Sequence, residues 1–438
     1  MYTFLLKNLI MPMADRAMKT KISYFYKKII KMNKFDRNLI EEWQNEKLQK
    51  LIYHAYNNTT YYKKLFDDHK INPSSIKTKS DLKRIPNLTK SIIIENFKDL
   101  VPKNIENIPH KNASTGGSTG DPLNYLLDYR SWSFSAANNM VNWEKTSYSY
   151  GNKYIALGST SLFVNEKQSL KHSIYYRLKN RIGLNGINMS DEVCERYVQL
   201  IKSKNIKYLY GYASAIYLLA RWSHKNNIKL NIDACFTTSE VLTESYKKGI
   251  IDSFNCDVVN CYGAHDGGVT AIQVNKGCFK VGYNSLITIK EKDSENVGSV
   301  LLTDLLNYAM PFINYELGDE LQINKRCDEY SDYNGQAFNR VYGRTSDIVR
   351  LENGSVITGP GFATLFHYIP VEGYSIEKTG FNTLTCKMKK IEGFNNHHEQ
   401  KIRSSLEMQS GDNSIVKLIY VDEFDLTKSG KKRYFINQ

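Results

Sequence analysis

The chain of 438 residues is long enough for two domains, and its 41% hydrophobic and 24% charged residues are typical of a soluble globular protein. No apolar run approaches the roughly 20 residues that span a bilayer, which excludes a bundle of transmembrane helices. The net charge of +14 permits an anionic partner, but no nucleic-acid-reading motif accompanies it, so we expect no nucleic acid partner.

The first 97 residues predict a helical region, because apolar residues recur at helical spacing, as in residues 41–56. Lysines are in local excess in the first third of the chain, as at Lys27 and Lys28. A basic solvated surface is one interpretation of them. Peripheral contact with an anionic membrane is the other, since basic amphipathic helices lie on such bilayers. The apolar start lacks a leading charged region and a cleavage site, so we do not expect a signal peptide.

Residues 114–122 read Ser-Thr-Gly-Gly-Ser-Thr-Gly-Asp-Pro, with three glycines and four hydroxyl residues in nine positions. Such a stretch favours a loop, in which free backbone N–H groups and hydroxyls can hold a polyphosphate. It matches neither the P-loop nor the dinucleotide fingerprint. A solvated Ser/Gly loop is the simpler interpretation of this stretch taken alone.

Strand and helix patterns alternate after this loop. Short apolar runs at residues 154–157, 207–210, 234–236 and 257–261 predict strands, and helical patterns separate them. This alternation predicts a doubly wound, mainly parallel sheet, which binds ligands at the carboxyl ends of its strands. From residue 297 the pattern is β-rich, with strands expected at residues 298–303, 312–315 and 320–323. A final segment from residue 344 mixes strands at 382–386 and 415–420 with a helix at 397–407, which predicts a small α+β domain.

The seven cysteines are odd in number and widely spaced, with no C-x-x-C pair. This pattern argues against a disulfide framework and favours a reducing cytoplasm.

Four further motifs follow the loop. Asp266 ends the run Asn-Cys-Tyr-Gly-Ala-His-Asp, and such an acid after a buried strand could ligate Mg²⁺. Asp319 ends Tyr-Glu-Leu-Gly-Asp, where a carboxylate could accept both hydroxyls of a ribose. Residues 343–347 read Gly-Arg-Thr-Ser-Asp, and Lys431 follows a Ser-Gly pair. Each motif is weak evidence by itself. Chance does not readily explain the occurrence of all of them in this order along one chain.

In this order the motifs resemble those of the acyl-adenylate-forming superfamily. Residues 48–62, 81–90, 211–214 and 237–240 resemble its phenylacetate–CoA ligase-like branch, which includes coenzyme F390 synthetase-like and CapK-type capsular polysaccharide biosynthesis proteins. The resemblance covers nearly the whole chain. It implies a large adenylate-forming domain at residues 1–343, with 1–97 as its helical N-terminal region, and a small mobile α+β domain at 344–438 that carries the catalytic lysine.

The resemblance also implies a role for individual residues. The loop would close over the phosphates of ATP through Ser114, Thr115, Gly116, Gly117, Ser118, Thr119 and Gly120. The adenine side would be lined by Thr238, Ser239 and Glu240 and by the stacking ring of Tyr262, with Gly263 also at the nucleotide. Asp266 would bind Mg²⁺ next to His265, and Asp319 would bind the ribose near Arg344. Asp347 would be the hinge, and Lys431 would drive adenylation.

The implied activity is an ATP-dependent, AMP-forming ligase that activates a carboxylic acid and passes the acyl group to an amine or a thiol, CoA included. A cytoplasmic role in surface polysaccharide biosynthesis is favoured. An aryl-acid CoA ligase is one alternative, and a non-catalytic nucleotide-binding or membrane-associated scaffold is another. Asp266 is shorter than the family's usual glutamate, and His265 replaces a hydroxyl. The branch often holds a structural zinc, but here Cys278 and Cys327 lack a C-x-C pair, so buried thiols are expected instead. The sequence leaves the oligomeric state open.

Overall fold

The computed structural model describes residues 2–115, 123–158, 179–186, 189–264, 266–273, 277–290, 297–323, 327, 333–344, 348–350, 356–358, 366, 369–410, 414–422 and 435–437. The chain divides into two compact units. The larger consists of Met1–Gly116, Leu123–Leu317 and Gln322–Arg340. The smaller consists of Gly117–Pro122, Gly318–Leu321 and Val341–Gln438.

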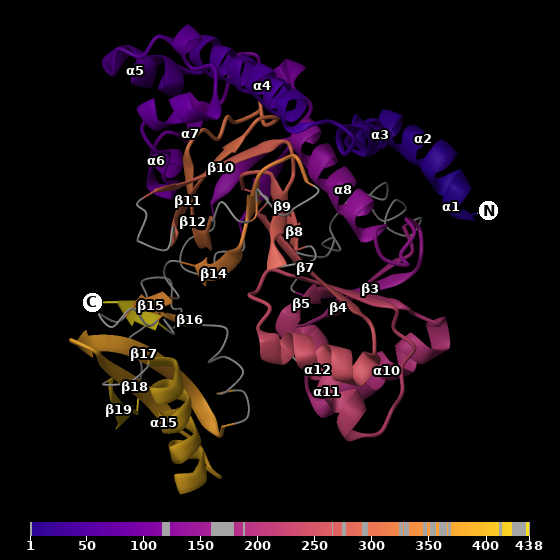
Figure 1. The fold of residues 1–438 in the computed structure, drawn as a ribbon, viewed down its shortest axis with the longest axis vertical. Coiled ribbons are helices and arrows are strands. Elements are labelled where there is room, and N and C mark those ends of the chain that lie inside the picture. The colour runs from indigo at the N-terminus through magenta and orange to yellow at the C-terminus, as the bar shows by residue number, and fades with distance from the viewer. Residues whose placement is uncertain are drawn as a thin grey trace. The chain divides into compact units, whose positions relative to one another are not determined.

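The N-terminal part of the larger unit is helical, as predicted (Figure 1). Side chains at the N-caps start its longer helices: Asp36 accepts from Leu39 N at α4, and Thr59 accepts from Tyr62 N at α5. The elements are α1 (Tyr2–Leu5), a π-helical turn η1 (Leu6–Ile10), α2 (Met11–Met18), α3 (Ile22–Met32), α4 (Arg37–Asn58), α5 (Thr60–Asp68), η2 (Pro73–Ser75), η3 (Lys79–Arg84), α6 (Lys90–Glu95), α7 (Phe97–Leu100) and η4 (Ile105–Asn107).

A mixed eight-stranded sheet lies at the centre of the larger unit, in the order β13-β9-β8-β7-β6-β5-β3-β4. Five strands are parallel: β3 (Tyr154–Gly158), β4 (Arg181–Asn185), β5 (Tyr208–Tyr212), β6 (Ala234–Thr238) and β7 (Asp257–Ala264). Three antiparallel strands extend it: β8 (Val269–Gln273), β9 (Phe279–Val281) and β13 (Ala337–Phe338). The predicted parallel α/β core is therefore confirmed.

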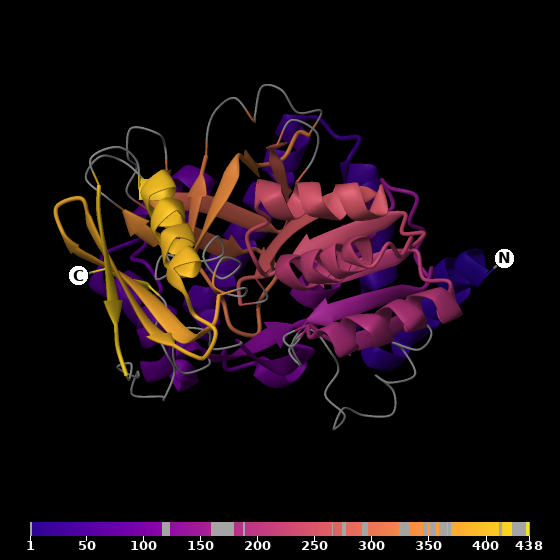
Figure 2. The ribbon, with the colours of Figure 1, turned by 90° about the horizontal axis from the view of Figure 1, so that it is seen from below.

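Helices cover both faces of the parallel strands. On one face lie α10 (Asp191–Lys204), α11 (Ala213–Lys225) and α12 (Glu244–Phe254), side by side in magenta and pink in Figure 2. These helices pack on residues such as Leu157, Leu209 and Cys235. On the other face, α8 (Tyr129–Trp143) stacks its Trp143 on Phe236, with ring centroids 4.3 Å apart. Burial on both faces explains why these strands read as short apolar runs.

A β-hairpin that the sequence did not predict precedes α8. It consists of β1 (His110–Ser114) and β2 (Asn124–Asp128), and Ser114 pairs with Asn124. The expectation that Ser114 lies in the loop is therefore wrong, because it is the last residue of β1. The Ser/Gly stretch begins at the tip of this hairpin.

A four-stranded sheet has the order β10-β11-β12-β14, from β10 (Ser285–Lys290), β11 (Val297–Asp304), β12 (Tyr315–Gln322) and β14 (Arg340–Arg344). The strand expected at residues 312–315 is wrong, since β12 starts only at Tyr315. Among the described residues, no helix is both long enough and apolar enough to cross a bilayer.

The smaller unit is α+β, as predicted. Its sheet has the order β19-β18-β17-β20, built from β17 (Val371–Gly380), β18 (Thr383–Lys390), β19 (Ile415–Tyr420) and β20 (Phe435–Asn437). The helix α15 (Asn396–Ser410) buries Ile402 and Leu406 against this sheet. A short hairpin pairs β15 (Ile348–Arg350) with β16 (Val356–Thr358).

Candidate functional site

The carboxyl ends of the parallel strands bring several predicted residues to one edge of the large sheet. Tyr212 ends β5, Thr238 ends β6 and Ala264 ends β7. Because β3 lies between β4 and β5, the order of the sheet reverses there, and ligands bind beside such a switch point.

Gly211 allows two of these strands to approach closely at that edge. A Cβ at this position would lie 1.9 Å from the carbonyl oxygen of Leu157 on β3. Any side chain would therefore push β5 away from its neighbour. Gly211, the glycine of the Gly-Tyr-Ala-Ser segment, therefore maintains the close pairing of β5 with β3.

Glu240 follows β6 and holds the start of α11. Its Oε2 accepts from the backbone N of Ser214 at 2.8 Å, and its Oε1 accepts from Ser214 Oγ at 3.0 Å. The N-cap residue Tyr212 makes no such bond with its side chain, so Glu240 satisfies the helix terminus in its place. Burial raises the pKa of Glu240, and the two bonds from Ser214 oppose that rise. Of its neighbours, Thr238 is buried and Ser239 is exposed with a positive φ of 66°.

Tyr262 and Asp266 flank the end of β7. The ring of Tyr262 meets that of Phe338 edge to face, with centroids 5.5 Å apart. Asp266 is only 7% exposed, and its Oδ2 accepts from the hydroxyl of Tyr315 at 3.2 Å. Gly263 pairs with Thr270 within the β7–β8 ladder, while His265 lies outside the described residues. The structure thus supplies a buried, oriented carboxylate where the sequence predicts a metal ligand.

A buried polar network that the sequence did not predict supports the turn after Asp266. Gly268 has a φ of +65°, and a Cβ there would lie 2.2 Å from Asp304 Oδ2, so only glycine fits. The carbonyl oxygen of Gly268 accepts from Ser135 Oγ at 3.0 Å and from Asn284 Nδ2 at 2.8 Å. This turn is therefore fixed from behind by α8 and by the segment before β10.

Asp304 lies at the centre of that network and is fully buried. It accepts from Ser131 Oγ at 2.5 Å and from the backbone N of Leu306 at 3.1 Å. Burial raises its pKa to about 7, although both bonds favour the ionised form. One signal was present in the sequence, since Asp304 directly follows the predicted strand 298–303.

The mouth of the Ser/Gly loop is closed by two hydrogen bonds. Thr115 N donates to Leu123 O at 3.0 Å, and Leu123 N donates to Thr115 Oγ1 at 2.9 Å. Thr115 thus uses its hydroxyl within the hairpin. The remaining predicted loop residues lie outside the described residues, namely Gly116, Gly117, Ser118, Thr119 and Gly120.

The other predicted residues belong to the smaller unit. Asp319 lies on β12 and is 8% exposed, and Arg344 ends β14, the next strand of that sheet. Asp347 and Lys431 lie outside the described residues.

Cys278 and Cys327 form a disulfide, with Cα atoms 5.8 Å apart across 49 residues of sequence. The expectation that both are buried thiols is therefore wrong. Their spacing in the sequence could not reveal the pair, because the fold alone brings them together. In the part of the chain that the structure describes, no three His, Cys, Asp or Glu side chains cluster as a metal site.

Comparison with known proteins supports a relationship along the whole chain. It is 20% identical over 419 residues to protein CapK of Staphylococcus aureus, covering 94% of this chain and 92% of that protein. It is 21% identical over 311 residues to phenylacetate-coenzyme A ligase of Thermus thermophilus, covering 65% of each. No protein-family model matches the chain.

Among solved structures, the fold matches an open conformation of 2-hydroxyisobutyryl-CoA ligase in complex with 2-HIB-AMP and CoA. The TM-score is 0.60 at 15% identity, covering 91% of each chain. The ordered motifs, one nearly full-length and one partial sequence relationship, and the shared fold agree with one another. The chain is thus similar to AMP-forming carboxylate ligases, and the comparisons support its resemblance to the acyl-adenylate-forming superfamily and to the phenylacetate–CoA ligase-like and CapK-type branch.

Proposed function

We propose that this protein uses ATP to activate a carboxylic acid as an acyl-adenylate and then transfers the acyl group to an amine or thiol acceptor. The observation that carries the proposal is the carboxylate of Asp266, buried at the carboxyl edge of the sheet and bonded by Tyr315. In the first step a carboxylate oxygen of the acid attacks the α-phosphorus, and pyrophosphate leaves. In the second the acceptor attacks the acyl carbon, AMP leaves, and the acceptor's proton passes to solvent.

Asp266 fits the role of an Mg²⁺ ligand. One protein carboxylate together with substrate phosphate oxygens is the donor set that Mg²⁺ commonly takes. When bound, Mg²⁺ would offset the charge of the phosphates that the acid must approach. The hydroxyl of Tyr315 holds one oxygen of Asp266, and the turn at Gly268 fixes the backbone behind it.

We assign the nucleotide contacts as the family resemblance implies. The loop from Thr115 to Gly120 would cover the phosphates, and Thr238, Ser239 and Tyr262 would line the adenine. Glu240 would act there through α11, since both of its oxygens are bonded to Ser214. Asp319 would bind the ribose, with Arg344 on the neighbouring strand. Residues 344–438 would rotate about Asp347 and carry Lys431 into and out of the site.

The acceptor and the setting are the finer part of the proposal. The matched structure of 2-hydroxyisobutyryl-CoA ligase contains CoA, which supports a thiol acceptor and an acyl-CoA ligase as the second candidate. The CapK relationship extends over nearly all of both chains. Together with the family resemblance, it leads us to propose surface polysaccharide biosynthesis as the setting and an amine as the first candidate acceptor. We place the enzyme in the cytoplasm.

Hydroxylamine trapping tests the activity before the acceptor is known. The full chain is incubated with ATP, Mg²⁺, hydroxylamine and a panel of amino, aryl and uronic acids. We expect one class of acid to give a hydroxamate together with pyrophosphate. Nucleotide binding with no hydroxamate from any acid would instead support the non-catalytic scaffold. Repeating the active reaction with CoA or an amino sugar then separates the two acceptors.

Lys431 is tested by separating the two half-reactions. Lys431→Ala should lower acid-dependent pyrophosphate release at least about 100-fold, because it removes the charge aimed at the transition state. Acyl transfer from supplied acyl-AMP should remain nearly intact. Lys428→Ala, three residues earlier, is the matched control and should leave both steps unchanged. Near-normal pyrophosphate release by Lys431→Ala would refute the assignment.

A further inference from the structure

Half of the net charge of this protein lies in its first 34 residues. They include eight basic residues and a single acidic one, Asp15, within a chain of net charge +14. This acid is buried, although it also lines the larger cavity described below. It accepts from Thr20 Oγ1, Ile22 N and Ser23 N at 2.6, 3.0 and 2.7 Å, and so caps α3. The basic segment is therefore folded, with its one acid turned inward.

The segment is also fixed to the rest of the larger unit. Tyr26 donates to Glu144 Oε2 at 2.6 Å, and Lys7 forms an ion pair with the same carboxylate. Phe25 packs edge to face on Phe134 of α8, with ring centroids 5.3 Å apart. We call α1, η1, α2 and α3 (residues 2–32) the N-terminal platform.

The outer side of the platform carries a row of apolar side chains. Phe4, Leu9 and Met13 are 69%, 55% and 64% exposed. They align because the π-helical turn, in which Met11 N donates to Leu6 O, brings residues five apart onto one face, and the following α-helix aligns residues four apart. The opposite face buries Leu6 and Met11 in the core. These side chains lie on folded, packed helices. Their exposure does not contribute to the packing of this chain.

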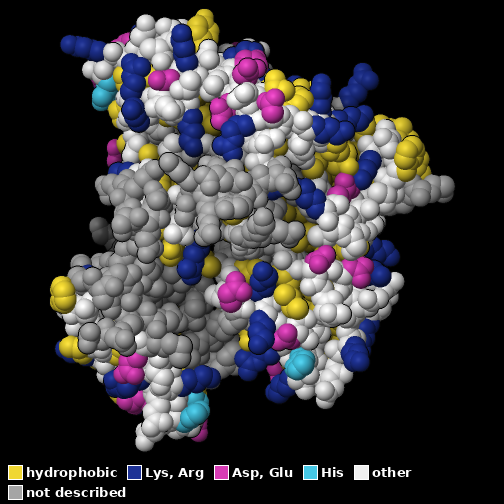
Figure 3. Space-filling view, in the orientation of Figure 1, with side chains coloured by type: hydrophobic (Ala, Val, Ile, Leu, Met, Phe, Trp, Pro, Cys, Tyr) yellow, Lys and Arg dark blue, Asp and Glu magenta, His cyan; other side chains and the backbone are white. Residues whose placement is uncertain are grey.

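Lysines accompany this row on α3. Tyr24, Lys27 and Lys31 are exposed at spacings of three and four residues, away from the buried Phe25 and Ile29, and the half-buried Lys28 lies beside them. Lys28 Nζ lies 5.0 Å from the ring centroid of Trp43. In Figure 3, hydrophobic and basic side chains are neighbours over these helices.

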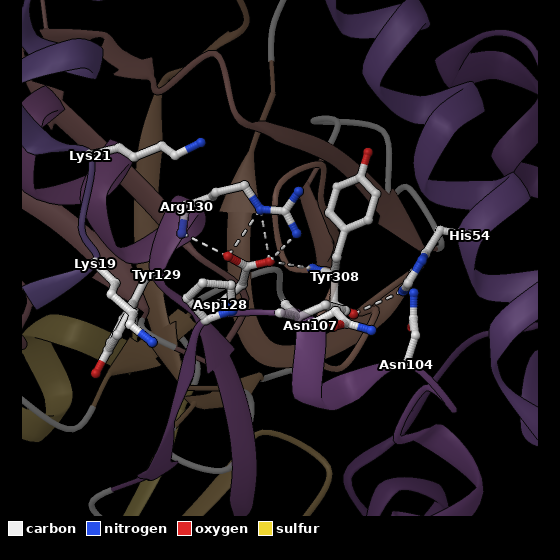
Figure 4. Close-up of a pocket in the computed structure, with 11 residues that line it drawn as sticks. Lys19, Lys21, His54, Asn104, Asn107, Asp128, Tyr129, Arg130 and Tyr308 are labelled. Atoms are coloured by element: carbon white, nitrogen blue, oxygen red, sulfur yellow. Dashed lines mark hydrogen bonds and ion pairs between the residues drawn. The ribbon is translucent and has the colours of Figure 1, made fainter. Parts of the chain in front are cut away.

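A basic groove lies at the foot of the platform. One cavity of about 590 Å³ is lined by Lys21, Lys28, Lys47, Lys50 and Arg130 together with aromatic side chains. A second cavity of about 360 Å³ shares Lys21 and Arg130 with it. Figure 4 shows Lys19 and Lys21 on one side of this second cavity and His54 on the other.

Arg130 is held rigidly between the two cavities. It donates to Asp128 Oδ2 at 2.5 Å, and its guanidinium lies 4.3 Å from the ring centroid of Tyr308. The groove therefore offers a fixed guanidinium, paired with Asp128, beside aromatic surface and several lysines.

We propose that the N-terminal platform docks on a bilayer that contains anionic phospholipid. Phe4, Leu9 and Met13 enter the boundary between headgroups and acyl chains, as the apolar face of an interfacial helix does. The lysines of α3 attract the lipid phosphates, and the groove at Arg130 receives a headgroup. The surface is independent of the ligase chemistry, because docking needs neither ATP nor the acid.

The combination of features favours a bilayer over other partners. A soluble polyanion would explain the lysines and the groove but not the exposed apolar row. A second copy of the chain would bury that row, but it would also bring two strongly basic faces together, at a cost in electrostatic repulsion. Only an anionic bilayer matches both parts of the surface.

Vesicle sedimentation tests the proposal with the full chain in the absence of ATP. We expect binding to vesicles of phosphatidylcholine with phosphatidylglycerol, and at least tenfold less binding to phosphatidylcholine alone. Binding should weaken as salt shortens the Debye length. The triple variant Lys27→Gln, Lys28→Gln, Lys31→Gln should lose about 100-fold in partition coefficient.

Two matched variants make this test specific. Three exposed lysines of α10 and α11 can be changed in the same way, as Lys202→Gln, Lys204→Gln and Lys225→Gln, and should leave partition nearly unchanged. The pair Phe4→Ser, Met13→Ser should lower it at least tenfold without a change in thermal unfolding, since both side chains are exposed.

Three outcomes would overturn the proposal. The first is an equal loss of vesicle partition in both lysine triple variants. The second is vesicle binding that does not depend on phosphatidylglycerol. The third is dimerisation or heparin binding without vesicle binding. A ligase that proves inactive on every acid would leave the vesicle result standing, so the two proposals fail separately.

Discussion

The carboxyl edge of the large sheet and the N-terminal platform handle charge in opposite ways. At the sheet edge, the carboxylates of Asp266 and Asp304 are 7% and 0% exposed and have hydroxyl donors from Tyr315 and Ser131. On the platform, the cations lie on the outer face of a packed scaffold. A buried charge is linked to the free energy of unfolding, whereas an exposed charge responds mainly to salt and to a partner. Substitutions in the two regions should therefore change different measurements.

Asp304 should give the largest effect, on the pH dependence of stability. Its pKa is about 7 in the folded protein and near 3.8 otherwise. Between about pH 4 and pH 7 the unfolded chain loses this proton and the folded chain keeps it, so the free energy of unfolding falls as pH rises, by up to about 4 kcal/mol. Asp304→Asn cannot ionise and should flatten that fall in urea titrations. Asp257→Asn, at an exposed position, should keep it. Equal slopes in wild type and Asp304→Asn would contradict the burial argument.

Asp266→Asn should reduce pyrophosphate release about 100-fold, because it removes the carboxylate proposed to bind Mg²⁺. The Mg²⁺ concentration needed for half-maximal rate should rise as well, and vesicle binding should not change. Asp257→Asn, at the other end of β7, is again the control. An unaltered Mg²⁺ dependence would remove Asp266 from the metal site.

Asp15→Ala tests whether the platform depends on its single buried acid. The change removes three hydrogen bonds at the start of α3 and should cost about 2 kcal/mol of stability, at the upper end for an N-cap. Vesicle binding should weaken with it, while pyrophosphate release stays the same. Asp36→Ala, which removes one exposed cap at α4, should cost less than half as much. A loss of activity without a loss of docking would mean that the two regions are not separable.

Tyr315→Phe should have the smallest effect. It removes one neutral hydroxyl from Asp266 Oδ2, a bond worth about 1 kcal/mol, and should slow pyrophosphate release about fivefold. The reduction should be larger at low Mg²⁺ concentration, because the oriented carboxylate matters most there. A rate equal to that of wild type at every Mg²⁺ concentration would show that Tyr315 does not position Asp266.

The sequence predicted the parallel core of the fold because its strands are buried on both faces. Runs such as residues 154–157 and 234–236 are apolar throughout. Such a run can be recognised in the sequence even when the neighbouring strands are not known. It missed β1 and β4, whose residues alternate between partly buried and exposed positions. Strands of this kind are defined by the strand that they pair with, and local composition does not reveal it.

The candidate site was predictable where one short segment contains the chemistry, as at Asp266 and Asp319. Contacts between distant segments were not. Tyr315 reaches Asp266 across 49 residues, and Ser131 reaches Asp304 across 173. Glu240 shows the same limit: its position after β6 was predicted, but its bonds to Ser214 depend on the packing of α11.

The π-helical turn at Leu6–Ile10 sets the phase between two stretches of one helical rod. Deleting one residue there, such as Asn8, would restore ordinary helical spacing, and because the wider π turn already absorbs the extra residue, Phe4 would keep nearly the same direction relative to Met13. Every lysine of the chain would be retained, and so would the ligase fold. The apolar row should thus tolerate the loss of one codon at this turn, with the net charge unaltered.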